Sequence, residues 1–221
     1  MIAPWPNLLL SIVKRDEQEE KNSRLETSPT PEEAQREKKS SGFDRGIMKR
    51  VLLLTGKPGT GKTGAIKEAI AKAKIKAGGF YTQEIRTGGV RQGFRIVTLD
   101  GEEAVLAHIS ISSPYQVSKY KVDIDSLNKV GVSALRRGLE ECDLIIIDEI
   151  GKMELLSPQF KETVSQAIDS GKKVLGTIML TPHPFADEIK RRQEVKTLLV
   201  TRANHDDTMR ELFNWLAEEV N

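Results

Sequence analysis

Apolar positions follow two distinct periods from residue 51 to the end of the chain. Short continuous apolar runs predict strands that are buried on both faces, and apolar residues that recur every three or four positions predict amphipathic helices. Apolar runs that alternate with apolar stripes along the chain are typical of an open α/β sheet with helices on both faces. The runs lie at residues 51–55, 142–147, 173–178 and 197–200, and the stripes lie at residues 65–73, 127–139, 160–168 and 209–220.

A different pattern separates the first stripe from the second. Three strands are predicted here, at residues 80–86, 93–99 and 103–107. Thr87-Gly88-Gly89 and Asp100-Gly101 stand between them and are turn signals, so we expect an antiparallel meander attached to the main sheet. We expect Gly78-Gly79, just before the meander, to end the preceding helix.

The beginning of the chain has neither pattern. Between Lys14 and Gly46, three of 33 residues are apolar, eight are Lys or Arg and nine are Asp or Glu. Such a stretch cannot bury enough apolar surface to offset an ordering entropy of about 1–2 kcal/mol per residue. We therefore expect residues 1–47 to form a disordered extension and residues 48–221 to form one domain. Met48 stands at this boundary and is a candidate translation start.

Composition narrows the class of protein. With 34 basic and 32 acidic residues the net charge is +2, which argues against a protein that coats nucleic acid. A local basic patch is still compatible with this net charge. The single cysteine, Cys142, excludes an intramolecular disulfide and fits a reducing compartment. No apolar run approaches the ~20 residues of a membrane helix, and the N-terminus reads poorly as a signal peptide. We expect a soluble, cytoplasmic protein without a membrane partner.

A phosphate-binding loop follows the first predicted strand. It matches the pattern G-x-x-x-x-G-K-[ST] in full and precedes a predicted helix, which is the context that confirms this motif. Its glycines let backbone N–H groups approach phosphate oxygens at the positive end of the helix. Lys62 is expected to reach the β- and γ-phosphates of a nucleoside triphosphate, and the Thr63 hydroxyl to bind Mg²⁺. The nucleotide-binding loop consists of Gly56, Lys57, Pro58, Gly59, Thr60, Gly61, Lys62 and Thr63.

Two acids end the apolar run at residues 142–147. Asp148 stands where the strand emerges, and a carboxylate at this point suits a second Mg²⁺ ligand beside Thr63. Glu149 follows directly and fits a base or orienting group for an attacking water. A poised water favours hydrolysis over transfer to an organic acceptor, so Glu149 and Lys62 are the expected catalytic residues.

Four further positions have either a functional or a structural explanation. Thr177, near the end of the run at residues 173–178, fits either a sensor of the γ-phosphate or a structural residue. Arg191 and Arg192 fit either an arginine finger or a solvated helix face, and nothing in the sequence chooses between them. Gly64 costs its helix up to about 1 kcal/mol relative to alanine, and we expect it to permit a close packing contact.

Two motifs besides the phosphate loop carry a family resemblance. They are G-F-Y-T-x-E at residues 79–84 and D-E-I-G-K-M-E-L at residues 148–155. With them, residues 48–221 resemble the THEP1-type nucleoside-triphosphatases, a small P-loop family. The resemblance implies a RecA-like strand arrangement and Mg²⁺-dependent hydrolysis of nucleoside triphosphates to diphosphate and phosphate, with loose base selectivity.

Carried over by position, the resemblance assigns phosphate and metal binding to Lys62 and Thr63, metal binding to Asp148, and the attacking water to Glu149. Gly64 departs from the family, in which a second threonine is common, and residues 1–47 have no family counterpart.

Two other functions stay open from the sequence. A nucleotide or small-molecule kinase is the alternative, although no Arg-rich insertion suited to a water-excluding lid is evident. A slow nucleotide-dependent switch or RNA-binding module is the third hypothesis, weakly supported by the charged N-terminal segment. The preferred nucleotide, the oligomeric state and an arginine supplied by another chain also stay open.

Overall fold

The structure is a computed structural model that describes residues 49–72 and 75–218. The predicted extension at residues 1–47 and the candidate start at Met48 lie outside the described residues. So do Ala73 and Val220, which belong to two of the predicted apolar stripes.

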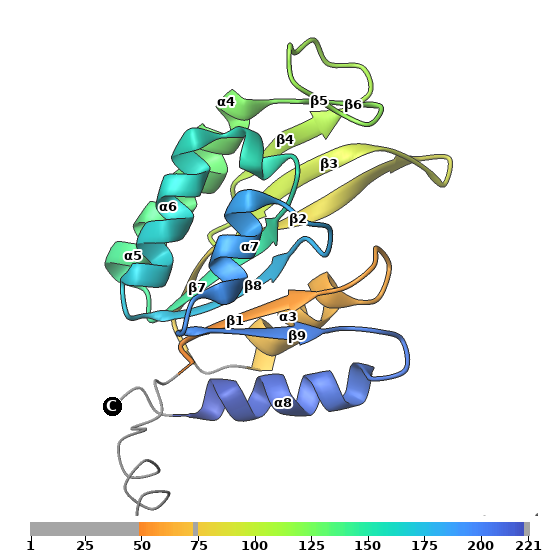
Figure 1. The fold of residues 1–221 in the computed structure, drawn as a ribbon. Helices are drawn as coiled ribbons and strands as arrows, with labels where there is room; N and C mark the ends of the chain where they lie inside the picture. The colour runs from red at the N-terminus through yellow and green to blue at the C-terminus, as the bar shows by residue number, and fades with distance from the viewer. Residues whose placement is uncertain (1–48, 73–74, 219–221) are drawn as a thin grey trace, which may run out of the picture. The chain divides into compact units, whose positions relative to one another are not determined.

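One mixed sheet runs through the described part of the chain (Figure 1). Its strands are β1 (Val51–Thr55), β2 (Ala77–Thr87), β3 (Val90–Thr98), β4 (Glu103–His108), β5 (Gln116–Val117), β6 (Tyr120–Val122), β7 (Leu144–Ile150), β8 (Lys173–Ile178) and β9 (Val195–Leu199). The strand order is β5-β6-β4-β3-β2-β7-β8-β1-β9. Strands β2, β7, β8, β1 and β9 are parallel, and the meander β3-β4-β6-β5 continues from β2 in antiparallel pairing. The predicted parallel sheet with an attached meander is confirmed.

Helices cover both faces of the parallel strands (Figure 1). On one face lie α3 (Lys62–Lys72) and α8 (His205–Ala217), and on the other lie α5 (Ser133–Glu141), α6 (Pro158–Asp169) and α7 (Pro184–Arg191). Three shorter elements are α4 (Ile124–Ser126), the π-helix η2 (Leu127–Val132) and the 3-10 helix η3 (Glu154–Leu156). The result is a three-layer α/β/α arrangement.

Strand β1 shows why the central strands read as continuous apolar runs. Leu52 and Leu54 pack into the core beneath α3 and α8, whereas Val51 and Leu53 pack into the core beneath α5, α6 and α7. All five residues of the strand are buried. Because both faces are covered, both sets of alternate side chains must be apolar, and each fully buried leucine stabilises the fold by about 1.5–3 kcal/mol.

The two glycines before the meander are placed differently from the sequence prediction. Gly78 and Gly79 lie inside β2 and do not end α3, which closes at Lys72. A Cβ on Gly79 would lie 2.1 Å from the Ile146 carbonyl oxygen, and φ there is +111°. A Cβ on Gly78 would lie 2.7 Å from the Cα of Gly138 on α5. The prediction was wrong because these glycines serve close packing within the sheet and against a helix.

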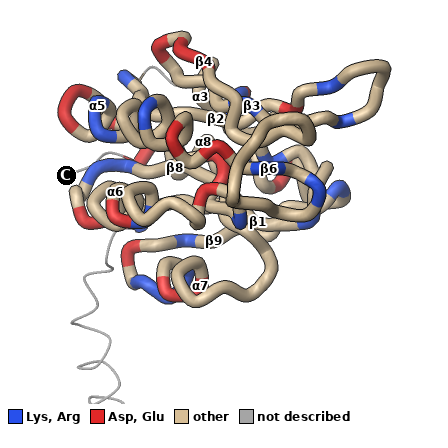
Figure 2. Tube along the Cα trace, turned by 90° about the horizontal axis from the view of Figure 1, so that it is seen from above, with Lys and Arg blue, Asp and Glu red and all other residues tan. Residues whose placement is uncertain are grey.

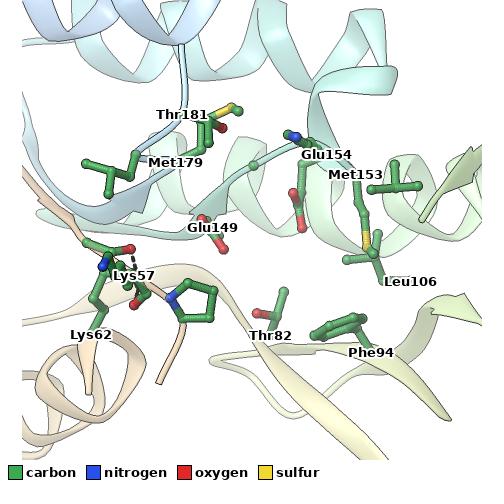
Figure 3. A pocket seen from close by; sticks show the side chains of 16 residues that line it. Lys57, Lys62, Thr82, Phe94, Leu106, Glu149, Met153, Glu154, Met179 and Thr181 are labelled. Carbon is green, nitrogen blue, oxygen red and sulfur yellow. Dashed lines mark hydrogen bonds between the residues drawn. The ribbon is translucent and has the colours of Figure 1, made fainter. Parts of the chain in front are cut away.

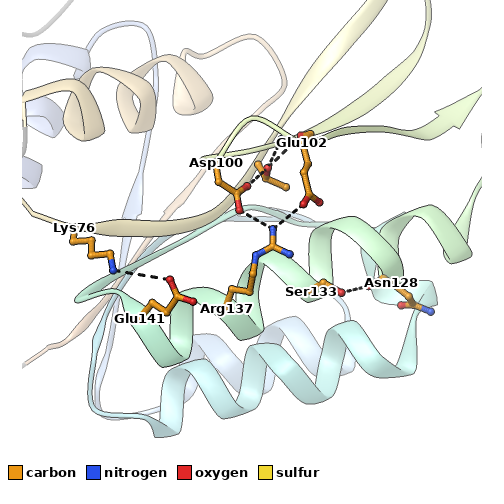
Figure 4. Close-up of polar contacts among 8 residues, drawn as sticks. Lys76, Asp100, Glu102, Asn128, Ser133, Arg137 and Glu141 are labelled. Carbon is orange, nitrogen blue, oxygen red and sulfur yellow. Dashed lines mark hydrogen bonds and ion pairs between the residues drawn. The ribbon is translucent and has the colours of Figure 1, made fainter.

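Ion pairs connect α5 to the turn between β3 and β4 (Figure 4). The Arg137 Nη2 lies 2.7 Å from Asp100 Oδ2 and 3.5 Å from Glu102 Oε1. At the other end of α5, Lys76 and Glu141 are 4.0 Å apart. These side chains are largely exposed, so each pair contributes at most about 1 kcal/mol, and the apolar contacts beneath the helix hold it in place.

Charge is mixed over the helices, as Figure 2 shows. Helices α5, α6 and α7 each carry both basic and acidic residues. Within residues 49–72 and 75–218, no helix is both long and apolar enough to cross a membrane. Trp215 and Cys142 are buried, and the Trp215 Nε1 donates to the Lys49 carbonyl at 2.6 Å.

Candidate functional site

Parallel strands bring the candidate residues to one edge of the sheet. The phosphate loop follows β1, Asp148 and Glu149 lie near the end of β7, and Thr177 lies near the end of β8. Strand β8 pairs with both β1 and β7, so it separates the loop from the two acids by one strand. Carboxyl ends of parallel strands are the usual place for ligand sites in open α/β sheets.

Backbone carbonyl oxygens lie close to the first glycine and to the lysine of the phosphate loop. Gly56 has φ of +148°, and a Cβ there would lie 2.4 Å from the Val200 carbonyl oxygen. The Lys62 Nζ donates to the carbonyl oxygens of Gly56 at 3.0 Å and Lys57 at 3.1 Å. Helix α3 begins at Lys62, so the positive end of its dipole faces the loop. The arrangement offers backbone donors, a helix N-terminus and a lysine to an anion.

Asp148 is held in place at the floor of the site. Its side chain is 1% exposed, and the Thr177 hydroxyl donates to its Oδ1 at 2.6 Å. Its Oδ2 is buried and has no hydrogen-bond partner among the described residues. Burial raises the pKa of Asp148, while the Thr177 and Thr63 hydroxyls and the Lys62 charge act to lower it. A buried, unpaired carboxylate oxygen beside a threonine hydroxyl fits a hard divalent cation such as Mg²⁺.

Asp148 has few neighbouring side chains that could bind a metal ion with it. Among the residues that the structure describes, no group of three or more His, Cys, Asp or Glu side chains could hold a metal ion. Mg²⁺ is commonly bound through one or two carboxylates together with substrate phosphates. The donor set of Asp148 and Thr63 therefore suits a metal that arrives with a nucleotide.

Glu149 lies between the phosphate loop and the far wall of the site (Figure 3). Burial, and then the charge of Asp148, raise the pKa of Glu149, whereas Lys62 lowers it. A carboxylate with a raised pKa is a better proton acceptor than an exposed one, which suits general-base chemistry.

Glu154 is a residue of this site to which the sequence analysis assigned no role. It lies in η3 and is 5% exposed. A Cβ on Gly151 would lie 2.9 Å from Glu154 Oε2 and 3.3 Å from Glu149 Cδ, so the two carboxyls flank this glycine. Burial, and then the charge of Glu149, raise the pKa of Glu154 to about 8. The signal in the sequence was an acid between the apolar residues Met153 and Leu155.

Two arginines on the β2–β3 hairpin line a cavity that the phosphate loop also lines. Arg86 Nε donates to Glu84 Oε2 at 2.7 Å, and Arg91 Nη1 donates to Glu84 Oε1 at 2.5 Å. A cavity of about 730 Å³, the phosphate cavity, opens between the loop and this hairpin. Its lining includes Lys62, Thr63, Glu84, Arg86, Arg91, Asp148, Glu149 and Thr177. Nothing in the sequence marks these arginines, because only the pairing of β2 with β3 brings them to the cavity.

Arg191 and Arg192 lie elsewhere. Helix α7 starts beyond the end of β8 and runs back, so Arg191 ends it at the opposite edge of the sheet, before β9 begins (Figure 1). Arg192 pairs there with Asp169 and Glu194. Of the two alternatives that the sequence left open, this placement favours a solvated helix end over an arginine finger supplied within one chain. The role of Thr177 as a γ-phosphate sensor stays a prediction, and what the structure shows is its bond to Asp148.

Gly64 has open space around it. A Cβ there would meet nothing within 4 Å, so the expected close packing contact is wrong. Next to it, a Cβ on Gly61 would lie 3.3 Å from Cδ2 of His205, at the start of α8. His205 therefore lies beside the loop, a position that its sequence context did not indicate.

The fold and the site together define a P-loop protein. One strand, β8, lies between β1, which leads into the phosphate loop, and β7, which carries Asp148 and Glu149. The sequence model of the NTPase family matches residues 51–213, and the chain belongs to this family.

Relatives of known name and structure agree with this assignment. The chain is 47% identical to nucleoside-triphosphatase THEP1 of Thermotoga sp. (strain RQ2) over 165 residues, which are 75% of this chain and 94% of that protein. It is 38% identical to the cancer-related nucleoside-triphosphatase homolog of Mus musculus over 179 residues, which cover 73% of this chain and 94% of that protein. The crystal structure of THEP1 from Aquifex aeolicus matches with a TM-score of 0.71 and 32% identity, over 76% of this chain and 99% of that chain. The family resemblance and the predicted fold class are confirmed.

Proposed function

We propose that this protein hydrolyses nucleoside triphosphates to diphosphate and phosphate with Mg²⁺ as cofactor. The observation that carries the proposal is the complete phosphate loop with Asp148 and Glu149 at the same sheet edge. Relatives named nucleoside-triphosphatases support it, since they match this chain over nearly their whole length.

Binding falls to the loop and its two neighbours. Backbone N–H groups of the loop would cradle the phosphates, and Lys62 would leave its carbonyl partners for the β- and γ-phosphate oxygens. Thr63 and Asp148 would hold Mg²⁺, which neutralises charge on the phosphate oxygens when bound.

Hydrolysis then requires a positioned water. Glu149 would accept a proton from this water while the water oxygen attacks the γ-phosphorus, and the diphosphate leaves with the bridging oxygen. Lys62, in contact with the β- and γ-phosphates, would stabilise the developing charge on the diphosphate.

A further positive group is available within the same chain. Arg91 and Arg86 share Glu84 as a counter-ion and line the phosphate cavity. An arriving triphosphate would compete with Glu84 for these guanidinium groups, which suit planar contacts to phosphate oxygens. We assign to Arg91 the stabilising role that the sequence analysis sought at Arg191 or Arg192.

Phosphate release tests the proposal directly. The full chain is incubated with ATP, GTP, CTP or UTP, with and without Mg²⁺, and free phosphate is measured. We expect release from more than one nucleotide and only with Mg²⁺, because the loop reads phosphates and not bases. Failure with all four nucleotides would overturn the proposal.

A further inference from the structure

A second cavity adjoins the phosphate cavity, and Figure 3 shows the side chains that line it. Its volume is about 590 Å³, within the range of sites for small organic ligands. We call it the apolar cavity, because its lining includes the side chains of Phe94, Leu106, Val117, Met153, Met179 and Leu180. It shares Pro58, Lys62, Thr82, Phe94 and Glu149 with the phosphate cavity, so the two spaces meet at Lys62 and Glu149.

A bound nucleotide would leave the apolar cavity largely empty. The lysine of a phosphate loop reaches the β- and γ-phosphates, and the Lys62 ammonium lies at the start of the loop, against Gly56 and Lys57. Gly56 and Lys57 line the apolar cavity, whereas Thr63 and Gly64 line only the phosphate cavity. The terminal phosphate would therefore face the apolar cavity, and the nucleoside would extend the other way.

The polar side chains of the apolar cavity include a pair of carboxyls. Figure 3 shows Glu149 and Glu154 pointing into the space from β7 and η3. Glu154 is buried, and the charge of Glu149 opposes its ionisation. Three lysines, Lys57, Lys62 and Lys152, also line the cavity. Lys57 and Lys152 are exposed to solvent, and the Lys62 ammonium donates to the carbonyl oxygens of Gly56 and Lys57.

This combination indicates the kind of ligand. Six apolar side chains favour an apolar body, and two close carboxyls with little access to water favour a positive hydrogen-bond donor between them. A terminal phosphate at Lys62 would add negative charge on the same side. We propose that the apolar cavity is a binding site for a small organic cation, an amine on an aromatic or branched apolar body, held beside the γ-phosphate position. The proposal goes beyond hydrolysis, and its test uses no turnover.

Three indole compounds that differ mainly in charge test the assignment. Tryptamine is a cation, tryptophol is its neutral counterpart and indole-3-acetate is an anion, and each is titrated calorimetrically into the full chain without nucleotide. From typical ligand efficiencies, tryptamine should bind with a dissociation constant of about 1 mM. We expect tryptophol to bind about tenfold more weakly than tryptamine, and the anion more weakly still. Equal binding of all three, preference for the anion, or no binding at all would overturn the proposal.

Two pairs of variants place the tryptamine within the molecule. Val117→Phe fills the apolar cavity from β5, and Val105→Phe adds the same ring at an exposed site on β4 outside it. Glu154→Gln removes the buried acid, and Glu188→Gln removes an exposed acid on α7. We expect Val117→Phe and Glu154→Gln to weaken tryptamine binding at least about tenfold and the two controls to leave it unchanged.

Folding of each variant is checked by near-ultraviolet circular dichroism. If Glu154→Gln does not fold, the Val117→Phe and Val105→Phe pair decides alone. Unchanged tryptamine binding in a folded Val117→Phe variant contradicts the proposal, as does an equal loss in Val105→Phe.

A non-hydrolysable ATP analogue separates the apolar cavity from the nucleotide site. Tryptamine is titrated again at saturating adenylyl imidodiphosphate and Mg²⁺. Binding that is retained or strengthened supports a separate site beside the terminal phosphate. Loss of tryptamine binding in proportion to analogue occupancy means that the cavity belongs to the nucleotide, and the proposal falls. If the analogue itself does not bind, the proposed hydrolase function fails. The titration of tryptamine without nucleotide still decides whether the apolar cavity binds an organic cation.

Discussion

The parallel strands and the meander contribute to the site in different ways. In β1 and β8 every residue is buried, and the polar groups of the site follow directly at the ends of parallel strands. In the meander, apolar residues such as Val90 and Val105 are exposed by 56% and 39%, and charged pairs such as Arg95 with Glu103 lie on its surface. Even so, the meander supplies Arg91 and part of the apolar cavity, and β2, with which it pairs, supplies Arg86.

On the proposals above, the two regions divide a general reaction from the recognition of a particular ligand within one sheet. The groups proposed to bind phosphate and water lie at the ends of the buried parallel strands. The groups proposed to set charge and shape around the terminal phosphate come from β2, β3, β4 and β5, on one side of the sheet. The following predictions test whether chemistry and selectivity are divided in this way.

The largest effect is expected at the acid of the parallel half. Glu149→Gln should lower turnover by about 10²–10⁴-fold, because the amide cannot accept the proton of the attacking water. Nucleotide affinity should change little, and calorimetry with the non-hydrolysable analogue measures it. Glu188→Gln on α7 is the matched control. Wild-type turnover in the Glu149 variant would remove this residue from the mechanism.

Within the meander, the next effect is expected at Arg91. Arg91→Ala should lower turnover by about 10²-fold, because a positive donor to the transferring group is lost. Arg95→Ala removes an arginine of the same strand that pairs with Glu103 outside the phosphate cavity, and its turnover should match the wild type. Equal losses in both variants would show that the meander acts through stability alone.

A smaller effect is expected at the contact between β8 and β7. Thr177→Val removes the hydroxyl that donates to Asp148 at 2.6 Å. The Mg²⁺ concentration for half-maximal turnover should rise about tenfold, because groups that orient a metal ligand typically change metal affinity by 10–100-fold. Thr197→Val on β9 is the control, since its buried hydroxyl has no partner among the described residues. An unchanged Mg²⁺ requirement would leave Thr177 with a structural role only.

The smallest effects concern two glycines and the free energy of unfolding. Gly64→Ala should stabilise the protein by about 0.5–1 kcal/mol, because the methyl group meets nothing within 4 Å and alanine is the better helix former. Gly79→Ala should destabilise it by more than that, since its Cβ would lie 2.1 Å from the Ile146 carbonyl oxygen. Urea unfolding measures both, and the same sign of change in the two variants would contradict this account.

Much of the fold could be predicted from the sequence because local patterns have local causes. The runs at residues 51–55 and 173–178 coincide with β1 and β8, since strands buried on both faces need continuous apolar residues. The phosphate loop was recognisable because its contacts are made by its own backbone. Gly78 and Gly79 misled the prediction because a glycine that ends a helix and one that admits a close neighbour look alike in a sequence.

Local sequence patterns encode the alternation of strands and helices, the phosphate loop and the pair Asp148-Glu149, because each depends on residues that are adjacent in the chain. The folded arrangement was needed to show which arginines line the phosphate cavity. Arg86 and Arg91 lie there through the pairing of β2 with β3, and the return of α7 carries Arg191 away. It also placed Glu154 beside Glu149. Side chains from different elements meet through strand order and helix direction, and no local pattern encodes either.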